Sequence, residues 1–325
     1  MKAIVLRHAG DQPDMIVEDR PQPDVRAGFS LVRMHAATVN PLSNWIRKGI
    51  VSDSVNLPLV LSNDGVGFIE YSDVFAKRTP VLIYGGGQLG ISQDGLQQQW
   101  VSVENHRLFA VQDGVDLDAA AALAINYLTA HQALYRVGSV QTGQTVLISG
   151  ASGSVGHALI QLCVARGAHP IGVVSRADKT QQVLDSGASA VIDLSKQSIS
   201  VAVAEITGGA GVDWAFDVVG GTELRDLALA LRQRGSVVCI GFSGSTEGSL
   251  DIADLVIQEK RVLGYDAHLE SESDVYKVLN QLMTLAAAGA VAPRIDSRYA
   301  MSDYAQAYAR LESRKAMGTI LIDLN

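Results

Sequence analysis

Residues 145–156 read TVLISGASGSVG, a short apolar run that stops at small residues and passes directly into a helical pattern. This order predicts a strand, a tight turn and a helix. The turn carries the Ala-x-Gly-x-x-Gly form of the dinucleotide fingerprint at Ala151, Gly153 and Gly156. In that pattern Gly150 and Ala151 allow the tight turn, and Gly153 lets the backbone approach a diphosphate. Gly156 allows the helix to pack closely on the strand, so the stretch predicts a nucleotide site.

The helix predicted over residues 154–166 favours the same interpretation, because it would direct backbone N–H groups and its positive dipole end at the turn. An ordinary glycine turn between a strand and a helix would show the same pattern, so the neighbouring sequence has to decide. That sequence alternates apolar strands with helical patterns, the strands being predicted at residues 145–148, 170–174, 190–192, 212–217, 236–240 and 262–265. Six strands make a complete doubly wound parallel α/β sheet of the Rossmann type, which favours the nucleotide site.

The first third of the chain has a different pattern. Short β-branched or alternating runs, broken by Pro and Gly, predict an antiparallel, loop-rich β domain with strands at residues 1–6, 30–38, 66–71, 81–84 and 100–103. The proline-bearing stretch up to Ala27 suits an edge strand and loops, and a helical turn begins at Leu42. Helices are predicted over residues 118–123, 127–137 and 273–288, and a last strand over 318–323. With 325 residues, the chain has room for two domains.

Composition excludes several classes of partner. The net charge of −8 argues against nucleic acid or an anionic membrane, because both need a basic surface. No apolar run reaches membrane-spanning length and the N-terminus lacks the pattern of a secretory signal, so a cytoplasmic location is expected. Cys163 falls in a predicted helix and Cys239 in a predicted strand, and we interpret both as buried thiols. Two cysteines are too few for a disulfide framework or a cysteine-rich zinc lobe.

Glycine-bearing turns follow three of the predicted parallel strands, at residues 150–156, 218–221 and 241–244. In doubly wound sheets, ligands bind beyond the carboxyl ends of the strands, at the point where the strand order reverses. One such turn could be only a loop, but three at successive strand ends indicate a ligand crevice.

The end of the second strand of this sheet bears on the choice between NAD and NADP. An NAD site places an acid about twenty residues past the glycines, whereas an NADP site has basic and small residues there. Ser175, Arg176 and Lys179 would offer a 2′-phosphate a hydroxyl and two cations, which favours NADP(H). We interpret Asp178 as stabilising the first turn of the next helix. The alternative is that Arg176 and Lys179 form a solvated surface pair.

Four segments carry a resemblance to a known family: VNPLSNWIRKG at 39–49, AAAAL at 119–123, YLTAHQAL at 127–134 and AMGTILI at 316–322. Together with the nucleotide turn, they make the chain resemble the medium-chain dehydrogenase/reductase superfamily over essentially its whole length. Within that superfamily it is similar to the zinc-independent quinone oxidoreductase branch, to which zeta-crystallin belongs. The resemblance implies a mainly antiparallel GroES-like catalytic domain at residues 1–122 and 267–325, and a Rossmann dinucleotide-binding domain at residues 123–266.

Zinc-dependent relatives carry a cysteine where this chain has the region of Asn40, and Gly-His-Glu where it has SND at residues 62–64. A catalytic zinc needs about three Cys, His or carboxylate ligands, and the seven histidines here show no paired spacing. We expect core or surface roles for His35 and His131. Asp64 alone cannot hold zinc, and we interpret it as structural or as a polar wall of a site without metal.

The resemblance also implies which residues form the site. Asn40 would face the nicotinamide and the substrate; the alternative is a turn residue ahead of Pro41. Trp45 stands where family members often carry an active-site tyrosine, and it can donate an N–H bond or stack on a flat substrate but cannot supply a proton as a phenol can. Leu194 stands where some relatives place a tyrosine against the cofactor. The expected cofactor-binding residues are Thr129, Ala151, Ser152, Gly153, Ser154, Val155, Gly156, Ser175, Arg176, Lys179, Val219, Gly220, Phe242 and Ser243.

The leading hypothesis is an NADPH-dependent, zinc-independent oxidoreductase that transfers hydride to a small electrophile, either a quinone or an α,β-unsaturated carbonyl. Solvent or a ribose hydroxyl of the cofactor would then deliver the proton. A zinc-free alcohol or aldehyde dehydrogenase-like enzyme is the second hypothesis. The third is a nucleotide-binding protein without turnover, crystallin-like or redox-sensing. The predicted strand at residues 262–265 would lie at a sheet edge with apolar residues, so a homodimer is expected.

Overall fold

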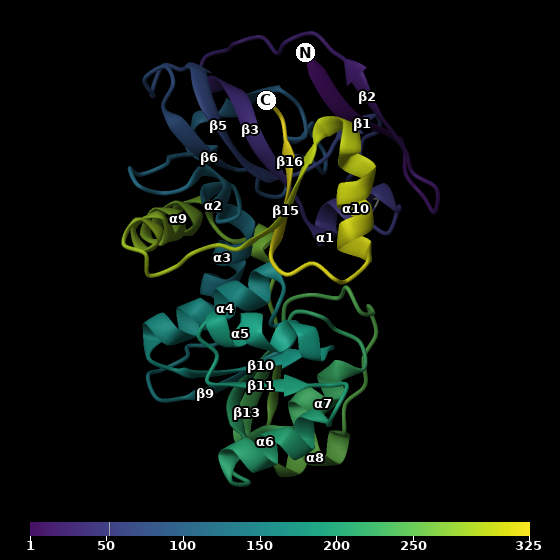
Figure 1. The fold of residues 1–325 in the computed structure, drawn as a ribbon, viewed down its shortest axis with the longest axis vertical. Helices are drawn as coiled ribbons and strands as arrows, with labels where there is room; N and C mark the ends of the chain where they lie inside the picture. Colours follow the sequence, from purple (N-terminus) through teal and green to yellow (C-terminus); the bar gives the residue numbers. More distant parts are fainter. Residues whose placement is uncertain (52) are drawn as a thin grey trace. The chain divides into compact units, whose positions relative to one another are not determined.

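A computed structural model describes residues 1–51 and 53–325 of the chain (Figure 1). Internal contacts divide these residues into two compact units. One unit consists of Met1–Ile125 and Ser271–Asn325 and is called the β unit below. The other, Asn126–Glu270, is called the α/β unit. The domain boundaries expected from the sequence, after residues 122 and 266, fall slightly earlier than these limits.

The α/β unit is built on a six-stranded parallel sheet, which confirms the predicted doubly wound α/β fold. The strand order is β11-β10-β9-β12-β13-β14, so the order reverses between β9 and β12. The inner strands are buried along nearly their whole length, as expected for a parallel sheet that is covered on both faces. The six strands are β9 (Thr145–Ile148), β10 (His169–Val174), β11 (Ala190–Asp193), β12 (Val212–Asp217), β13 (Leu231–Cys239) and β14 (Arg261–Gly264).

Helices cover both faces of this sheet, as right-handed crossovers require. In Figure 1, α4 and α5 lie on one face and α6, α7 and α8 on the other. Helix α4 has the bounds predicted from the sequence and ends at Gly167, whose φ of 75° lies in the left-handed region. The helix predicted over residues 127–137 begins earlier, as α3, and continues as a π-helical turn over Ala133–Val137. The bounds are α3 (Ala124–Gln132), α4 (Ser154–Arg166), α5 (Thr180–Asp185), α6 (Ile199–Thr207), α7 (Glu223–Leu229) and α8 (Ile252–Ile257).

The β unit contains two sheets, which confirms the mainly antiparallel β domain predicted for the first third of the chain. The smaller sheet has the order β2-β1-β4, with β2 at its edge. The larger has the order β15-β16-β3-β5-β6-β8, with β7 paired to β3, and only its β15–β16 pair is parallel. The strands are β1 (Lys2–His8), β2 (Asp14–Asp19), β3 (Phe29–Val39), β4 (Leu59–Val60), β5 (Asp64–Tyr71), β6 (Pro80–Tyr84), β7 (Trp100–Glu104), β8 (Leu108–Ala110), β15 (Ile295–Ala300) and β16 (Thr319–Asp323).

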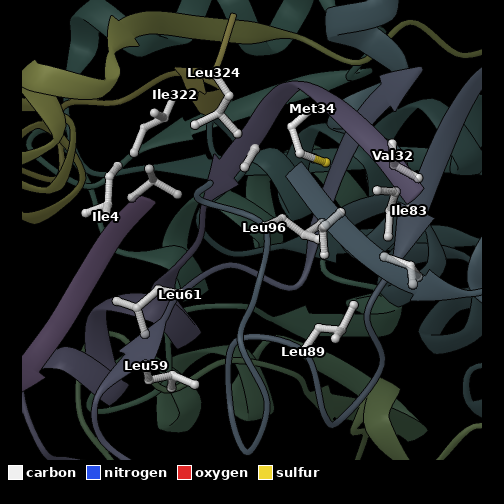
Figure 2. Packing of buried hydrophobic residues seen from close by; sticks show 14 of the residues in the cluster. Ile4, Val32, Met34, Leu59, Leu61, Ile83, Leu89, Leu96, Ile322 and Leu324 are labelled. Carbon is white, nitrogen blue, oxygen red and sulfur yellow. The ribbon is translucent and has the colours of Figure 1, made fainter. Parts of the chain in front are cut away.

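The core of the β unit joins its two chain segments. Figure 2 shows Met34 of β3 and Ile83 of β6 in one cluster with Leu96, Ile4 of β1 and Ile322 of β16. All five side chains are at most 1% exposed. Because residues from the N-terminal and C-terminal segments share this core, the two segments fold as one unit.

Helices α1 (Pro41–Arg47), α2 (Leu117–Ala121), α9 (Glu272–Ala287) and α10 (Tyr304–Glu312) complete the β unit. Helix α9 agrees with the sequence prediction within one residue at each end. Strand β15 was not predicted, because its sequence IDSRYA lacks the alternation of a half-buried strand. Among residues 1–51 and 53–325, no helix combines the length and the apolar composition needed to cross a membrane.

Candidate functional site

The turn between β9 and α4 has the geometry that the fingerprint predicts. Gly150 has a φ of 57°, in the left-handed region that favours glycine. A Cβ on Gly156 would lie 2.4 Å from the carbonyl oxygen of Gly150 and 2.7 Å from the Cα of Ala151. Only glycine therefore lets α4 approach the turn this closely. Ala151 is fully buried and donates its N–H to the carbonyl of Val173 at 3.1 Å, which ties the turn to β10 as well.

The space in front of this turn fits a diphosphate. Gly153 is the N-cap residue of α4 and has no side chain with which to cap the helix. A Cβ on Gly153 would meet only the Gly150 carbonyl oxygen, at 3.4 Å, so a side chain would occupy a position that is open here. Helix α4 has 13 residues, and its dipole favours an anionic group at Gly153, Ser154 and Val155. The residues present therefore fit the diphosphate of a nicotinamide dinucleotide.

Two further turns, at residues 218–221 and 241–245, follow strands β12 and β13. Gly220 and Ser245 form a parallel bridge, and the N–H of Gly244 donates to the carbonyl of Val219 at 2.7 Å. Since β9, β12 and β13 are neighbours in the sheet, the three predicted glycine-bearing turns lie at adjacent strand ends. They flank the position where the strand order reverses, which is where doubly wound sheets bind their ligands.

Ser149 and Asp217 hold the second turn in place, and the sequence analysis missed both. The Ser149 hydroxyl donates to Asp217 Oδ1 at 2.8 Å and accepts from the N–H of Val218 at 3.0 Å. The same Asp217 oxygen accepts from the N–H groups of Val219 and Gly220, at 3.0 and 2.9 Å. Both side chains are at most 1% exposed. The available signal was a polar residue directly after an apolar run, Ser149 after residues 146–148 and Asp217 after residues 214–216.

At the end of β10, the three residues expected at a 2′-phosphate have different surroundings. Arg176 is about half exposed and makes a two-pronged pair with Asp178, its Nε lying 3.1 Å from Asp178 Oδ1. Asp178 lies in the first turn of the short helix at Ala177–Lys179, where it was expected, and its carboxylate also binds this guanidinium. Lys179 is only 7% exposed, whereas Ser175 is exposed. The hydroxyl and one cation are thus accessible at this end of the sheet.

The remaining expected cofactor residues lie in separate elements of the α/β unit. Thr129 is buried in α3, at 8% exposure, and Phe242 is 40% exposed in the turn after β13. Leu194, where relatives place a tyrosine, packs partly buried against the core of the α/β unit. Cys163 is buried as predicted, but the prediction for Cys239 was wrong, because this residue at the end of β13 is only partly buried.

In the β unit, Asn40 belongs to a buried polar cluster with Thr38 and Asp64. The Asn40 Nδ2 donates to Asp64 Oδ1 at 2.9 Å and to Thr38 Oγ1 at 3.0 Å. The Thr38 hydroxyl donates to the same Asp64 oxygen, and the N–H of Ile125 donates to Asp64 Oδ2 at 3.4 Å. Asp64 is 0% exposed and Asn40 is 6% exposed. Asp64 therefore has the structural role that was expected: its carboxyl accepts the hydrogen bonds that hold Thr38, Asn40 and the Ile125 backbone together.

Burial raises the pKa of Asp64 to about 7, although the hydrogen bonds from Thr38, the Ile125 N–H and Asn40 each lower it. A carboxyl group in this position takes up or releases its proton near neutral pH. Its cross-strand partner on β6 is Tyr84.

Trp45 is half-buried in α1, one helical turn beyond Asn40. The partly buried His35 lies with its Nε2 3.4 Å from Asp118 Oδ1, and His131 of α3 is buried against Tyr135, as expected for histidines in core or surface roles. In the part of the chain that the structure describes, residues 1–51 and 53–325, no three His, Cys, Asp or Glu side chains form a group that could hold a metal ion.

Comparisons with known proteins agree with these features. A family described as "Zinc-binding dehydrogenase" matches residues 154–284. Quinone oxidoreductase from Rattus norvegicus is 26% identical over 328 residues, covering 99% of this chain and 97% of the relative. Quinone oxidoreductase from Pongo abelii is 25% identical over 317 residues, covering 96% of this chain and 94% of the relative. The crystal structure of an alcohol dehydrogenase superfamily protein from Novosphingobium aromaticivorans is 27% identical and covers 100% of both chains, with a TM-score of 0.88.

Proposed function

This chain belongs to the medium-chain dehydrogenase/reductase superfamily, in its quinone oxidoreductase-like branch, and on that premise we propose that it transfers hydride from NADPH to a quinone or an α,β-unsaturated carbonyl without zinc. It is an oxidoreductase of a family that binds nicotinamide dinucleotides. The observation that carries the proposal is the turn at residues 149–156, where Gly153 leaves room for a diphosphate at the start of α4. A bound nicotinamide supplies the hydride from its C4 atom.

The roles of the protein residues follow from their chemistry. Backbone N–H groups at Ser154 and Val155 would bind the diphosphate in the space beside Gly153, whose own N–H donates to the Gly150 carbonyl at 3.0 Å. Asn40 would line the reacting end, and Trp45 would stack on a flat acceptor or donate its indole N–H. An indole gives up no proton at neutral pH, so water or a ribose hydroxyl would protonate the reduced acceptor.

The absence of zinc from the proposed reaction rests on residue chemistry. Asn40 and residues 62–64 replace the ligands of zinc-dependent relatives, and Asp64 is held by hydrogen bonds within the protein. An acceptor oxygen would then be polarised by hydrogen bonds alone, which is why acceptors that are already electron-poor are favoured.

The purified, metal-stripped protein should oxidise NADPH when it is given an ortho-quinone or an enone, and it should not when it is given a simple ketone. The rate of NADPH oxidation against these three acceptors, with NADH in parallel, tests the proposal and separates its two substrate classes. Reduction of the ketone would instead indicate the alcohol or aldehyde dehydrogenase-like alternative. Tight NADPH binding without turnover of any acceptor would indicate a nucleotide-binding protein.

Replacing Arg176 with alanine should weaken NADPH binding by about 1.5–3 kcal/mol, the range for hydrogen bonds to charged groups. The guanidinium is accessible at the end of β10 and would bind the 2′-phosphate. Fluorescence titration gives the dissociation constants for NADPH and for NADH, which lacks that phosphate and serves as the control. An unchanged NADPH constant in the variant would remove the support for NADP(H) over NAD(H).

We also propose a homodimer that forms through the edge of the α/β sheet. Strand β14 lies at that edge with Val262 39% exposed, and Val256 and Ile257 of α8 are 68% and 69% exposed. A second copy pairing along β14 would cover this apolar surface.

The proposal also includes a cytoplasmic location, which cell fractionation tests.

Sedimentation equilibrium should give a dimer mass for the wild type and a monomer mass for Val256→Asp, because a buried carboxylate opposes pairing. Val201→Asp is the matched control, since Val201 is 52% exposed on α6, which packs against β11 and α7. A wild-type monomer at working concentration would contradict the dimer, and a dimeric Val256→Asp protein would contradict its placement at this edge of the sheet.

A further inference from the structure

Asn40 occupies the N-cap position of α1, where asparagine is among the preferred capping residues. A capping asparagine accepts backbone N–H groups with its Oδ1. Here the backbone at Asn40 is extended, with φ −103° and ψ 161°, as a cap requires, yet the side chain makes no capping hydrogen bond. The helix therefore gives up a contact worth about 1 kcal/mol, which indicates that the amide is held for another purpose.

The contacts of the amide nitrogen set its orientation. Nδ2 donates to Asp64 Oδ1 at 2.9 Å and to Thr38 Oγ1 at 3.0 Å, which uses both of its N–H groups inside the buried cluster. Oδ1 is on the other branch of the planar amide, and it accepts no hydrogen bond from the residues that the structure describes. Asn40 thus has an acceptor to offer and no donor.

Asp64 is the residue that fixes this orientation. Asp64 Oδ1 accepts from the Thr38 hydroxyl and remains an acceptor even when Oδ2 carries a proton, so it can face the amide nitrogen but not the amide oxygen. Thr38 alone would not choose between them, because a hydroxyl both donates and accepts. Since the Thr38 hydroxyl donates to Asp64, its remaining capacity is that of an acceptor, and this also selects the amide nitrogen.

From this geometry we infer that Asp64 is a positioning residue for Asn40, turning the amide so that Oδ1 accepts an N–H or O–H donor from the bound cofactor or the acceptor substrate. The inference rests on the proposed function in one respect, which is that Asn40 lines the site. It reverses the usual expectation for a carbonyl-reducing site, because Asn40 then binds a donor group and does not polarise the acceptor oxygen. Polarisation must come from another residue.

A double-mutant cycle in the full-length protein tests the inference. Asn40→Ala should lower kcat/KM for the best acceptor by about tenfold, the upper range for loss of one neutral hydrogen bond. Asp64→Leu, which removes the acceptor without leaving a buried charge, should cause a similar loss. Because both variants remove the same contact, the double variant should be no worse than Asn40→Ala alone. Asp64→Asn can still accept with its own Oδ1 and should stay within about threefold of wild type.

The matched control is Asp296→Asn. Asp296 is a buried carboxylate of the same unit, with a side chain 3% exposed, and it binds Arg310. Asp296→Asn perturbs the fold without contact to Asn40. The fold-loss in kcat/KM that it causes should therefore multiply with the fold-loss caused by Asn40→Ala. If the Asp64→Leu and Asn40→Ala losses also multiply, Asp64 acts only on stability and the inference is wrong.

A second measurement reads the orientation without activity. In ¹H–¹⁵N spectra, the side-chain NH₂ signal that disappears in Asn40→Ala belongs to Asn40. Its hydrogen exchange should be slow in the wild type and in Asp64→Asn, and at least about tenfold faster in Asp64→Leu. Unchanged exchange in Asp64→Leu would overturn the inference. If no acceptor is reduced, the proposed function fails, whereas this exchange experiment still decides whether Asp64 positions Asn40.

The NADPH dissociation constant identifies the donor. If Asn40→Ala has a higher NADPH dissociation constant, the N–H or O–H group that binds Asn40 belongs to the nucleotide. If the constant is unchanged and kcat/KM is lower, that group belongs to the acceptor substrate. If neither quantity changes, Asn40 accepts no hydrogen bond in the site and the inference is overturned.

Discussion

Replacing Gly156 with alanine should weaken the binding of NADPH and NADH alike, by at least about tenfold, and lower the free energy of unfolding by about 1–3 kcal/mol. The added Cβ would lie 2.4 Å from the Gly150 carbonyl oxygen and 2.7 Å from the Ala151 Cα. Both are backbone atoms of the nucleotide turn, so no side chain can rotate to relieve the contact. Either α4 must move off the strand or the turn must open, and both changes displace the N–H groups that would bind a diphosphate.

Gly153→Ala separates packing from ligand binding in this turn. Its Cβ would meet only the Gly150 oxygen at 3.4 Å, an ordinary contact, so the free energy of unfolding should change little. The same Cβ would occupy the space assigned to the diphosphate, so cofactor binding should fall. Urea denaturation and fluorescence titration measure the two effects. Gly264→Ala, which adds a Cβ with no neighbour within 4 Å in the single chain, is the control for cofactor binding. Wild-type cofactor affinity in Gly156→Ala would contradict the assigned role of the turn.

Asp64→Asn should become more stable than the wild type as the pH rises from about 4 to about 7. Burial raises the pKa of Asp64 from 3.8 to about 7, so between these values the folded protein keeps a proton that the unfolded chain releases. Unfolding is therefore favoured by rising pH in this window. At about 1.4 kcal/mol per pKa unit, the cost of ionising the buried carboxyl reaches roughly 4 kcal/mol above pH 7. This cost is absent below pH 3.8, the pKa of Asp64 in the unfolded chain, because residue 64 is then uncharged in the wild type as well as in Asp64→Asn.

Denaturation followed by tryptophan fluorescence at pH 4.5, 6 and 8 measures this difference, since Trp45 and Trp100 report on the β unit. For Asp296→Asn the difference in stability from the wild type should change with pH in the opposite direction: the variant should become less stable than the wild type as the pH rises. Burial raises the pKa of Asp296, but the hydrogen bonds from Arg310, the Met317 N–H and Ser297 outweigh it and leave the pKa below its ordinary value. Ionised Asp296 therefore stabilises the folded protein at pH values above its pKa in the unfolded chain. This stabilisation is lost as the pH falls through its lower pKa in the folded protein. A pH-independent difference between Asp64→Asn and wild type would show that Asp64 has no raised pKa.

Much of the fold could be predicted from short-range patterns. Strands β9 and β12 and helix α4 have the predicted bounds, because an apolar run, a glycine turn and a helical period are each set by neighbouring residues. Strand β13 begins earlier than predicted, at Leu231, because its polar start carries no apolar pattern. The number of parallel strands in the sheet was also predicted, whereas the order of the strands came from the structure.

The amino-acid sequence by itself determined the nucleotide turn, because Ala151, Gly153 and Gly156 act over a few residues and their small size is itself the signal. Only the tertiary structure decided what surrounds the polar groups. It placed Asp64 against Asn40, buried Lys179 and joined Ser149 to Asp217 across two strands. Such pairings connect residues far apart in the chain and depend on which groups lose contact with water together. Burial is a property of the packed molecule, so no local pattern reveals which side of the Asn40 amide is turned inward.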